Sequence, residues 1–391
     1  MNFNRRDFLR SGLIGCSLAA SPLITPVTFA ATPAENRLVV IILRGGMDGL
    51  DVVRPYGDPM LGHLRPTLAG GPDQGAHDLD GFYALHPALA ALLPMWRAGE
   101  LGFVQAVSTP YRDKRSHFDG QDLLEAGTET MAGVRDGWLN RMLQAVPGIT
   151  AQTAYAIGRS DMKLLQGPAD VSNWSPNVAL GLSPVTEQLM TLVTESDPAL
   201  HAAWQEAQIL AALDAETETG GGISRRGAHV KIAEFAAQRL AEDARIAAFS
   251  LGGWDTHSGQ TRAMSRALGQ FADALNSLKF GLGSHVWERT TVVALTEFGR
   301  TARENGTRGT DHGTGGMMVM AGGAVRGGRV HGDWPGLRTS DLYQNRDLMP
   351  TRDVRAHVAW IMAGLMGLDR GTLETAVFPG LEMGGDPRLL L

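Results

Sequence analysis

The stretch LVVIILRGGMDG, residues 38–49, indicates the fold of this chain. Its first six residues are apolar and mostly β-branched, which is typical of a strand buried on both faces in a parallel sheet. Two glycines then allow a tight turn that leads to Asp48. Because open α/β sheets bind ligands beyond the carboxyl ends of their strands, Asp48 lies where a functional residue is expected.

Similar apolar runs alternate with helical patterns along the rest of the chain. We expect further strands at residues 101–107, 154–157, 246–251, 291–295 and 317–320. We expect helices at residues 87–97, 118–126, 230–244, 263–280 and 354–366, with Pro94 interrupting the first. This alternation predicts an α/β fold with a central, mainly parallel sheet flanked by helices.

The pattern indicates a single domain over residues 36–391. Residues 159–225 interrupt the alternation with a helical stretch and a polar, glycine-rich turn, and we expect a cap or insertion there, outside the sheet. Residues 322–336 contain many glycines, and we expect a loop near the end of the sheet.

Composition excludes several classes of protein. Of 391 residues, 43% are hydrophobic and the net charge is -6, so the chain is not intrinsically disordered. Acidic residues outnumber basic ones, 41 to 35, so nucleic acid is not an expected partner. No segment after residue 30 has the run of about 18 apolar residues that a membrane span needs.

Residues 1–30 predict a cleaved export signal. Residues 4–10 read NRRDFLR, the form of a twin-arginine signal, and an apolar run with a small-residue cleavage site follows up to Ala30. The expected partner during export is the twin-arginine translocase, and the expected location is the periplasm or the medium. Cleavage would remove Cys16, the single cysteine, which excludes disulfides and cysteine–zinc sites from the mature chain.

Side chains of metal-ligand type lie beside four of the predicted strands. They are Asp48, Asp255, His257, Glu297, Asp311 and His312. Each has an ordinary alternative when taken alone, such as helix capping for Asp48 or an ion pair with Arg300 for Glu297. As an ordered set at strand ends, they predict one site for a divalent metal ion.

Ser116 precedes the helix expected at residues 118–126, and Asp119 follows three residues later. This spacing predicts a capping box. The same position suits a nucleophile, because a helix N-terminus presents free N–H groups to a phosphate or sulfate. Both interpretations stay open, as do two roles for Arg300: pairing with Glu297, or holding an anionic oxygen of the substrate.

The motifs together resemble the DUF1501 family. In order they are the twin-arginine leader, LRGGMDGLD, RSHFDGQDLLEAG, GGWDTHSGQ, TEFGRT and GTDHGTGG, and they cover essentially the whole mature chain. DUF1501 proteins are in turn similar to the alkaline phosphatase-like superfamily, which includes sulfatases and phosphoglycerate or phosphopento-mutases. The resemblance implies an alkaline phosphatase-like fold.

The resemblance also implies roles for individual residues. Asp48 resembles the metal-binding Asp after the first strand, and Ser116 resembles the nucleophile. Asp255 and His257 resemble ligands of a second metal, while the counterparts of the remaining ligands are Glu297, Asp311 and His312. The superfamily's Asp-His pair is replaced by Glu297-Phe298, which removes a nitrogen ligand that His117 could replace. The reduced ligand set leaves two alternatives open: one oxygen-rich site for calcium, magnesium or manganese, or a two-zinc site.

Two classes of function follow. The first is an exported, metal-dependent hydrolase of phosphate or sulfate esters, in which Ser116 attacks a small anionic ester, His117 assists, and Arg115 or Arg300 holds its oxygens. The second is a non-catalytic binding or scaffold protein that retains the fold. The many Asp and His residues at strand ends favour the first class, and the incomplete ligand set favours the second.

Overall fold

The computed structural model describes residues 35–146, 154–157, 162–169, 171–174, 184–194, 204, 227–242 and 244–391. The chain divides into two units, Met1–Glu35 and Asn36–Leu391, and the second holds every element described below. The predicted export signal lies outside the described residues and stays a prediction.

A nine-stranded sheet forms the centre of the second unit. Its order is β11-β5-β10-β9-β1-β8-β6-β7, with β12 also paired to β5. β9, β1, β8, β6 and β7 are parallel, and β10 is antiparallel to both of its neighbours. The strands are β1 (Arg37–Leu43), β5 (Leu101–Ser108), β6 (Ala154–Ile157), β7 (Ser172–Trp174), β8 (Ile246–Leu251), β9 (Thr290–Leu295), β10 (Gly316–Ala321), β11 (Val330–His331) and β12 (Arg352–Asp353). The predicted mainly parallel sheet is confirmed.

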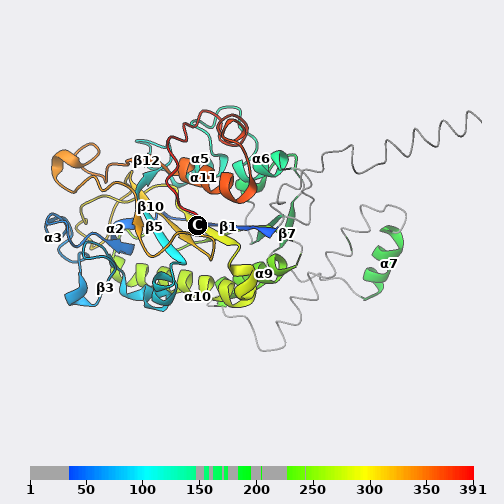
Figure 1. The fold of residues 1–391 in the computed structure, drawn as a ribbon, viewed down its shortest axis with the longest axis horizontal. Helices are drawn as coiled ribbons and strands as arrows, with labels where there is room; N and C mark the ends of the chain where they lie inside the picture. Colours follow the sequence, from blue (N-terminus) through cyan, green and yellow to red (C-terminus); the bar gives the residue numbers. More distant parts are fainter. Residues whose placement is uncertain are drawn as a thin grey trace, which may run out of the picture. The chain divides into compact units, whose positions relative to one another are not determined.

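Helices cover both faces of this sheet (Figure 1). The alternate residues Val39 and Ile41 of β1 face one core, while Val40 and Ile42 face the other, as the two-residue period of a strand requires. The first core includes η3 (Pro87–Leu92), α4 (Leu93–Arg97), α9 (Ala228–Ala241) and α10 (Gln260–Trp287). The second includes α5 (His117–Ala126), α6 (Trp138–Ala145) and α11 (Val354–Met366). The described part of the chain is therefore a three-layer α/β/α arrangement.

Shorter elements surround these layers. A three-stranded antiparallel sheet has the order β2-β4-β3. The remaining bounds are α2 (Gly49–Val52), β2 (Val53–Arg54), α3 (Leu61–Leu64), η2 (Pro72–Gln74), β3 (His77–Asp78), β4 (Ala84–Leu85), η5 (Lys163–Leu165), α7 (Pro184–Thr194), η7 (Thr339–Asp341), α12 (Arg370–Thr372) and η8 (Leu373–Val377).

Two details differ from the sequence-based expectation. Residues 159–225 were expected outside the sheet, but β7 within that span pairs with β6 at the sheet edge. The polar sequence of β7 gives no strand signal, and only its pairing with β6 makes it a strand. Most of the remaining span lies outside the described residues. The loop expected at residues 322–336 contains β11, which adds a short parallel pair to β5.

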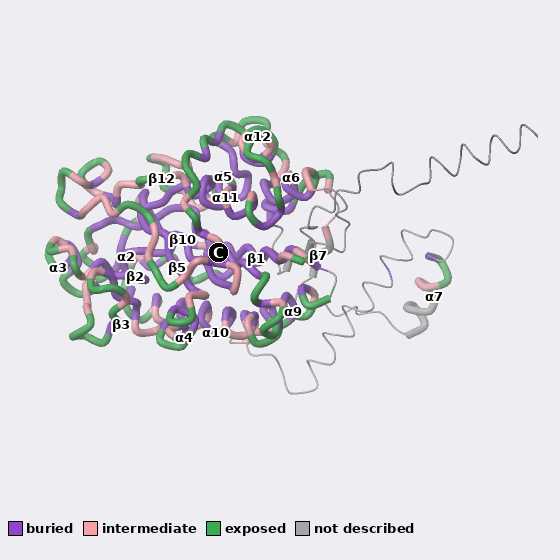
Figure 2. The backbone as a smooth tube through the Cα atoms, viewed as in Figure 1, coloured by how far each residue is buried: buried purple, intermediate pink, exposed green. Residues whose placement is uncertain are grey.

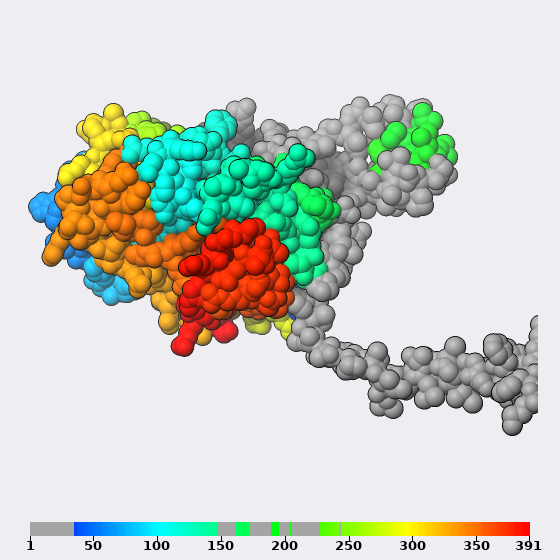
Figure 3. Space-filling view, turned by 90° about the horizontal axis from the view of Figure 1, so that it is seen from above, coloured from blue at the N-terminus to red at the C-terminus, as the bar shows by residue number. Residues whose placement is uncertain are grey.

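The sheet is the most buried part of the unit (Figure 2), and every residue of β1 is buried. The C-terminal segment (red) covers the surface beside α5 and α6 (blue-green), as Figure 3 shows. The Arg141 guanidinium of α6 donates to the carbonyl of Val377 there. Among the described residues, no helix combines the length and the apolar character that crossing a membrane requires.

Candidate metal centre

The topology of the sheet brings four loops to one edge. β9, β1 and β8 are adjacent and parallel, so the loops that follow them begin at the same edge. β10 runs antiparallel to β9 and β5, so the loop from β9 to β10 both begins and ends there, and the loop after β5 lies there too. The loop after β5 leads directly into α5. The residues singled out from the sequence all lie in these loops or in the first turn of α5.

The backbones of these loops approach one another closely. Gly45, after β1, has a left-handed φ of +124°, and a Cβ atom there would lie 2.6 Å from the backbone nitrogen of Asp255, after β8. A side chain at Gly45 is therefore excluded both by conformation and by space. The glycine after β1 is what allows the loop that carries Asp255 to pack against it.

Three histidines at this edge each bond outward through Nδ1. His117 Nδ1 lies 2.8 Å from Glu297 Oε1, and His257 Nδ1 lies 3.2 Å from Asp311 Oδ1. His312 Nδ1 lies 2.8 Å from the carbonyl oxygen of Arg115. A carbonyl or carboxylate oxygen can only accept, so each Nδ1 carries a proton, and each Nε2 presents a lone pair when its ring is neutral.

The three Nε2 atoms converge on Asp255. Their distances to its carboxylate oxygens are 3.4 Å from His117, 3.1 Å from His257 and 3.3 Å from His312. The Nε2 atoms of His257 and His312 are 3.0 Å apart. Two lone pairs at that distance repel each other unless a proton or a cation lies between them. We call His117, Asp255, His257 and His312 the histidine cluster.

Three members of the histidine cluster, His117, Asp255 and His312, fit a metal ion. Ligand atoms of His117, Asp255 and His312 all lie within 4.8 Å of one another. His117 Nε2 is buried and has no hydrogen-bond partner among the described residues, which is costly unless a ligand occupies it. Imidazole nitrogens with a carboxylate oxygen are a donor set for divalent transition metals, and outward Nδ1 bonds to oxygen are typical of metal-bound histidines.

Arg300 holds Asp255 in place. Its guanidinium is fully buried and donates to Asp255 Oδ1 at 2.7 Å, to the carbonyl of Gly46 at 2.6 Å and to the carbonyl of Thr310 at 3.0 Å. Burial raises the pKa of Asp255, but Arg300 and the neighbouring histidines lower it to about 2. Arg300 therefore positions a charged Asp255, and each of its three nitrogens donates to at least one protein oxygen.

Glu297 orients His117 and is fully buried. Its Oε1 accepts from His117 Nδ1, from Gln121 Nε2 at 3.1 Å and from the backbone N–H of Gly45 at 2.9 Å. Burial raises its pKa, but these hydrogen bonds outweigh burial and the pKa falls below its ordinary value. In this arrangement Glu297 lies behind His117 and faces the Nδ1 side of the ring.

Asp311 has the same relation to His257, but at the surface. It accepts from Asn305 Nδ2 at 3.1 Å and contacts His257 Nδ1. Its carboxylate is about half exposed, at 51%. Asp311 therefore orients His257 from a hydrated position, where hydrogen bonds are worth less than in the interior.

Asp48 lies in a separate, buried set of contacts. Arg65 donates to both of its oxygens, at 2.7 and 3.0 Å, and Gln260 Nε2 donates at 2.6 Å. Gln260 also donates to Asp51, which pairs with Arg54. We call these five residues the Asp48 network. Among the described residues, Asp48 makes no hydrogen bond or ion pair with the histidine cluster, and Arg65 neutralises its carboxylate.

Ser116 caps α5, but only half of the predicted capping box forms. Its Oγ accepts from the backbone N–H of Asp119 at 3.4 Å, whereas its own N–H donates to the hydroxyl of Tyr111 at 2.6 Å and not to the Asp119 carboxylate. Its hydroxyl makes no hydrogen bond to the histidine cluster in the described residues. The role of Ser116 as a nucleophile stays a prediction.

A profile of the family "Protein of unknown function (DUF1501)" matches residues 107–372. This chain belongs to the DUF1501 family. The matched span contains the whole histidine cluster, and Asp48 lies before it. No curated protein sequence matches the chain.

This DUF1501 protein is distantly similar to several solved structures. The lipoteichoic acid synthase LtaP from Listeria monocytogenes is 10% identical, with a TM-score of 0.43 over 90% of this chain and 78% of that chain. A protein in the alkaline phosphatase superfamily from Vibrio parahaemolyticus is 12% identical, with a TM-score of 0.37 over 86% and 68%. Ps i-CgsB in complex with k-i-k-neocarrahexaose is 10% identical, with a TM-score of 0.43 over 86% and 74%.

Phe298 packs between two histidines of the DUF1501 protein. Its ring centroid lies 5.2 Å from that of His117 and 4.8 Å from that of His312. A Cβ atom at Gly120 of α5 would approach the Phe298 ring to 3.0 Å. Phe298 thus holds two imidazole rings by packing.

Sequence reasoning missed three other residues of this edge. Gln121 had a usable signal, because it lies four residues after His117 and so shares its face of α5. Arg65 and Gln260 had none, since an isolated arginine or glutamine is an ordinary surface residue in a sequence.

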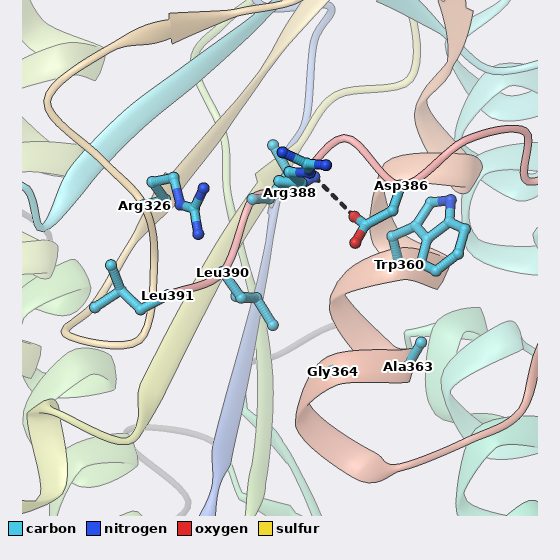
Figure 4. A pocket seen from close by; sticks show the side chains of 9 residues that line it. Arg326, Trp360, Ala363, Gly364, Asp386, Arg388, Leu390 and Leu391 are labelled. Carbon is cyan, nitrogen blue, oxygen red and sulfur yellow. Dashed lines mark hydrogen bonds between the residues drawn. The ribbon is translucent and has the colours of Figure 1, made fainter.

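A cavity of about 460 Å³ lies between α11 and the C-terminal residues (Figure 4). Its lining residues are Arg326, Trp360, Ala363, Gly364, Asp386, Arg388, Leu389, Leu390 and Leu391. None of them belongs to the histidine cluster, so this cavity is separate from the candidate metal centre.

Proposed function

We propose that this protein is an exported, metal-dependent hydrolase of phosphate or sulfate esters. The histidine cluster is the proposed metal site, and zinc suits its nitrogen-rich donor set better than calcium or magnesium, which prefer oxygen ligands. Export rests on the twin-arginine leader. Replacing Arg5 and Arg6 with Lys is expected to stop translocation, and unchanged delivery to the periplasm would contradict this.

One observation carries the proposal. His117 Nε2 is buried and makes no hydrogen bond in the described structure, and its contact is with Asp255 Oδ2 at 3.4 Å. The Nε2 atoms of His257 and His312 face Asp255 Oδ1. Three outward Nδ1 hydrogen bonds hold these rings in place. Such a preorganised set of lone pairs has a high cost in a folded protein unless it binds a cation.

A divalent metal ion in this site would polarise an ester oxygen as a Lewis acid. The residues of the chain have separate tasks. His117, Asp255, His257 and His312 hold the ion. Glu297 and Asp311 keep Nδ1 protonated on His117 and His257, and Arg300 keeps Asp255 charged and in place.

Two nucleophiles are available: the hydroxyl of Ser116 and a water molecule. Ser116 is adjacent to His117 and lies at the N-terminus of α5, where backbone N–H groups favour a developing negative charge. We therefore propose Ser116 as the attacking group and α5 as its electrostatic support.

The first experiment measures metal content and turnover of protein recovered after native export. We expect bound divalent metal and hydrolysis of nitrophenyl phosphate or nitrophenyl sulfate, both lost on chelation. Ser116→Ala is then expected to abolish turnover, to retain the metal, and to lose about 1 kcal/mol of unfolding free energy as a helix cap. Activity within a few-fold of wild type in Ser116→Ala would instead assign the attack to water.

The alternative is a non-catalytic binding protein. It is favoured by Arg300, which is fully buried and bonded to the protein itself, and by Asp48, which Arg65 neutralises. A wild-type protein that binds metal and hydrolyses neither ester would support this alternative over the hydrolase.

A further inference from the structure

The loop between β5 and α5 carries three cations in four residues, and they have different environments. The Arg112 guanidinium donates to the carbonyls of Thr109 and Tyr111, at 2.5 and 2.8 Å, so it braces its own loop. Lys114 and Arg115 are exposed, and their side chains make no hydrogen bond or ion pair with any described residue. The two free cations lie immediately before Ser116 and His117.

Arg115 is tied to the histidine cluster through its backbone. Its carbonyl oxygen lies 2.8 Å from His312 Nδ1. Its φ of +56° is left-handed, which is uncommon for a residue with a side chain and occurs often at functional sites. The Arg115 carbonyl thus orients His312, while the Arg115 residue is exposed.

Arg346 and Asp347 also lie beside His312. Asp347 pairs with Arg346, and Arg346 donates to the carbonyl of His312. Burial raises the pKa of Asp347, and the charges of Arg346 and Arg115 offset part of this rise.

Three arginines near the cluster are already engaged. Arg300 is buried against Asp255, Arg346 is paired with Asp347, and Arg44 is paired with Glu125 at 2.6 Å. Arg115 and the exposed Arg303 and Arg308 of the β9–β10 loop make no side-chain hydrogen bond or ion pair among the described residues. Arg115 differs from these two in its place, because it directly precedes Ser116 and His117 and its carbonyl contacts His312.

We propose that Arg115 binds the anionic group of the substrate and that the substrate is a monoester of phosphate or sulfate. The inference rests on the proposed function, because it concerns the substrate of the same site. A guanidinium binds two oxygens of a tetrahedral anion in parallel. If a third oxygen of the anion faces the histidine cluster, the substrate must have three non-bridging oxygens. A monoester has three and a diester has two.

The test compares Arg115→Gly with Arg115→Lys. Glycine adopts left-handed φ without strain, so Arg115→Gly removes the side chain and keeps the carbonyl that faces His312. Arg388→Gly is the matched control, because Arg388 is also exposed with a left-handed φ of 53° and lines the separate cavity in Figure 4. Binding of inorganic phosphate and of inorganic sulfate to the metal-loaded proteins is measured by calorimetry, which needs no turnover.

We expect Arg115→Gly to weaken binding of the anion about 10- to 100-fold, the range for loss of charge-assisted hydrogen bonds, with metal content unchanged. Arg115→Lys should recover part of the loss, and Arg388→Gly should bind as wild type. Equal binding by Arg115→Gly and wild type would overturn the inference, as would wild-type protein that binds neither anion.

Turnover separates this inference from the proposed function. If wild type hydrolyses nitrophenyl phosphate faster than bis(nitrophenyl) phosphate and Arg115→Gly raises KM for the monoester alone, both stand. A preference for the diester would overturn the inference and leave the hydrolase. Anion binding that depends on Arg115 without any turnover would keep Arg115 as an anion-binding residue and reject the hydrolase.

Discussion

The histidine cluster and the Asp48 network lie at the same edge of one sheet, yet their polar atoms are satisfied differently. In the Asp48 network, Arg65, Arg54 and Gln260 donate to the oxygens of Asp48 and Asp51. In the histidine cluster, three Nε2 lone pairs face one carboxylate, and one of them is buried without a hydrogen bond in the described structure. A strand-end carboxylate is therefore no evidence of a metal site until its own partners are known.

The two regions are physically connected. Thr310 Oγ1 contacts Asp48 at 3.4 Å and Gln260 at 2.7 Å, and its carbonyl accepts from Arg300 at 3.0 Å. Arg300 in turn holds Asp255. Thr310 and Arg300 thus connect the Asp48 network to the histidine cluster. We expect changes in the Asp48 network to reduce stability and changes in the histidine cluster to reduce metal binding.

Removing the Arg65 charge should have the largest effect, and on stability. Arg65→Met leaves Asp48 buried with an uncompensated charge, which is expected to cost about 3–5 kcal/mol of unfolding free energy. Urea unfolding measures this cost. The double variant Asp48→Asn with Arg65→Met removes both charges and should recover part of it. A loss below about 1 kcal/mol in Arg65→Met would show that the Asp48 network contributes little to the stability of the fold.

Removing a ligand of the histidine cluster should act on metal binding. His257 is 44% exposed, so His257→Ala should change the stability of the metal-free protein by only about 0.5 kcal/mol. Its affinity for divalent metal should fall by about 100-fold or more, because loss of a ligand exceeds the loss of an outer partner. Unchanged metal content in His257→Ala, measured by mass spectrometry, would remove His257 from the site.

The carboxylates that orient His117 and His257 should differ in their effect on metal affinity. Glu297 is fully buried and Asp311 is 51% exposed. Glu297→Gln keeps a hydrogen-bond acceptor for His117 and removes the charge, so metal affinity should fall about 10- to 100-fold. Asp311→Asn should have a smaller effect, since water competes for His257. Competition titration against a chelator gives both values, and equal losses would contradict the role assigned to burial.

A buried histidine outside both regions should make the stability of the protein depend on pH. His357 on α11 is buried, and neither ring nitrogen has a partner in the described structure. Burial, Arg352 and His331 lower its pKa from 6.5 to about 3. Since the unfolded chain protonates first, its contribution to stability is complete above pH 6.5 and declines as the pH falls toward 3.

His357→Leu removes this titration. The unfolding free energy of the variant should depend less on pH between 6.5 and 3, by up to about 1.4 kcal/mol per pH unit. Urea unfolding at a series of pH values measures the slope. Parallel slopes for the variant and wild type would contradict a neutral, buried His357.

The sequence alone predicted much of the framework. Expected strands at residues 154–157 and 246–251 have the bounds of β6 and β8, and the helix expected at 354–366 has those of α11. Apolar periodicity is a local property of the sequence, so it predicts an element correctly wherever tertiary packing does not override it. β7 was not predicted, because its sequence, Ser-Asn-Trp, has no strand pattern and forms a strand only by pairing with β6.

The candidate site divides in the same way. The sequence indicated which loops carry Asp, Glu and His, because strand ends can be read locally. It also determined that Ser116 caps α5, since the capping spacing is local.

Tertiary structure alone decided which of these side chains face a common point. Arg65 neutralises Asp48 from 17 residues away, and Gln260 reaches it from 212 residues away. The tautomers of His117, His257 and His312 likewise depend on acceptors 180, 54 and 197 residues distant. Whether a polar residue is a counter-ion, an orienting group or a ligand depends on partners that only folding brings within hydrogen-bonding distance.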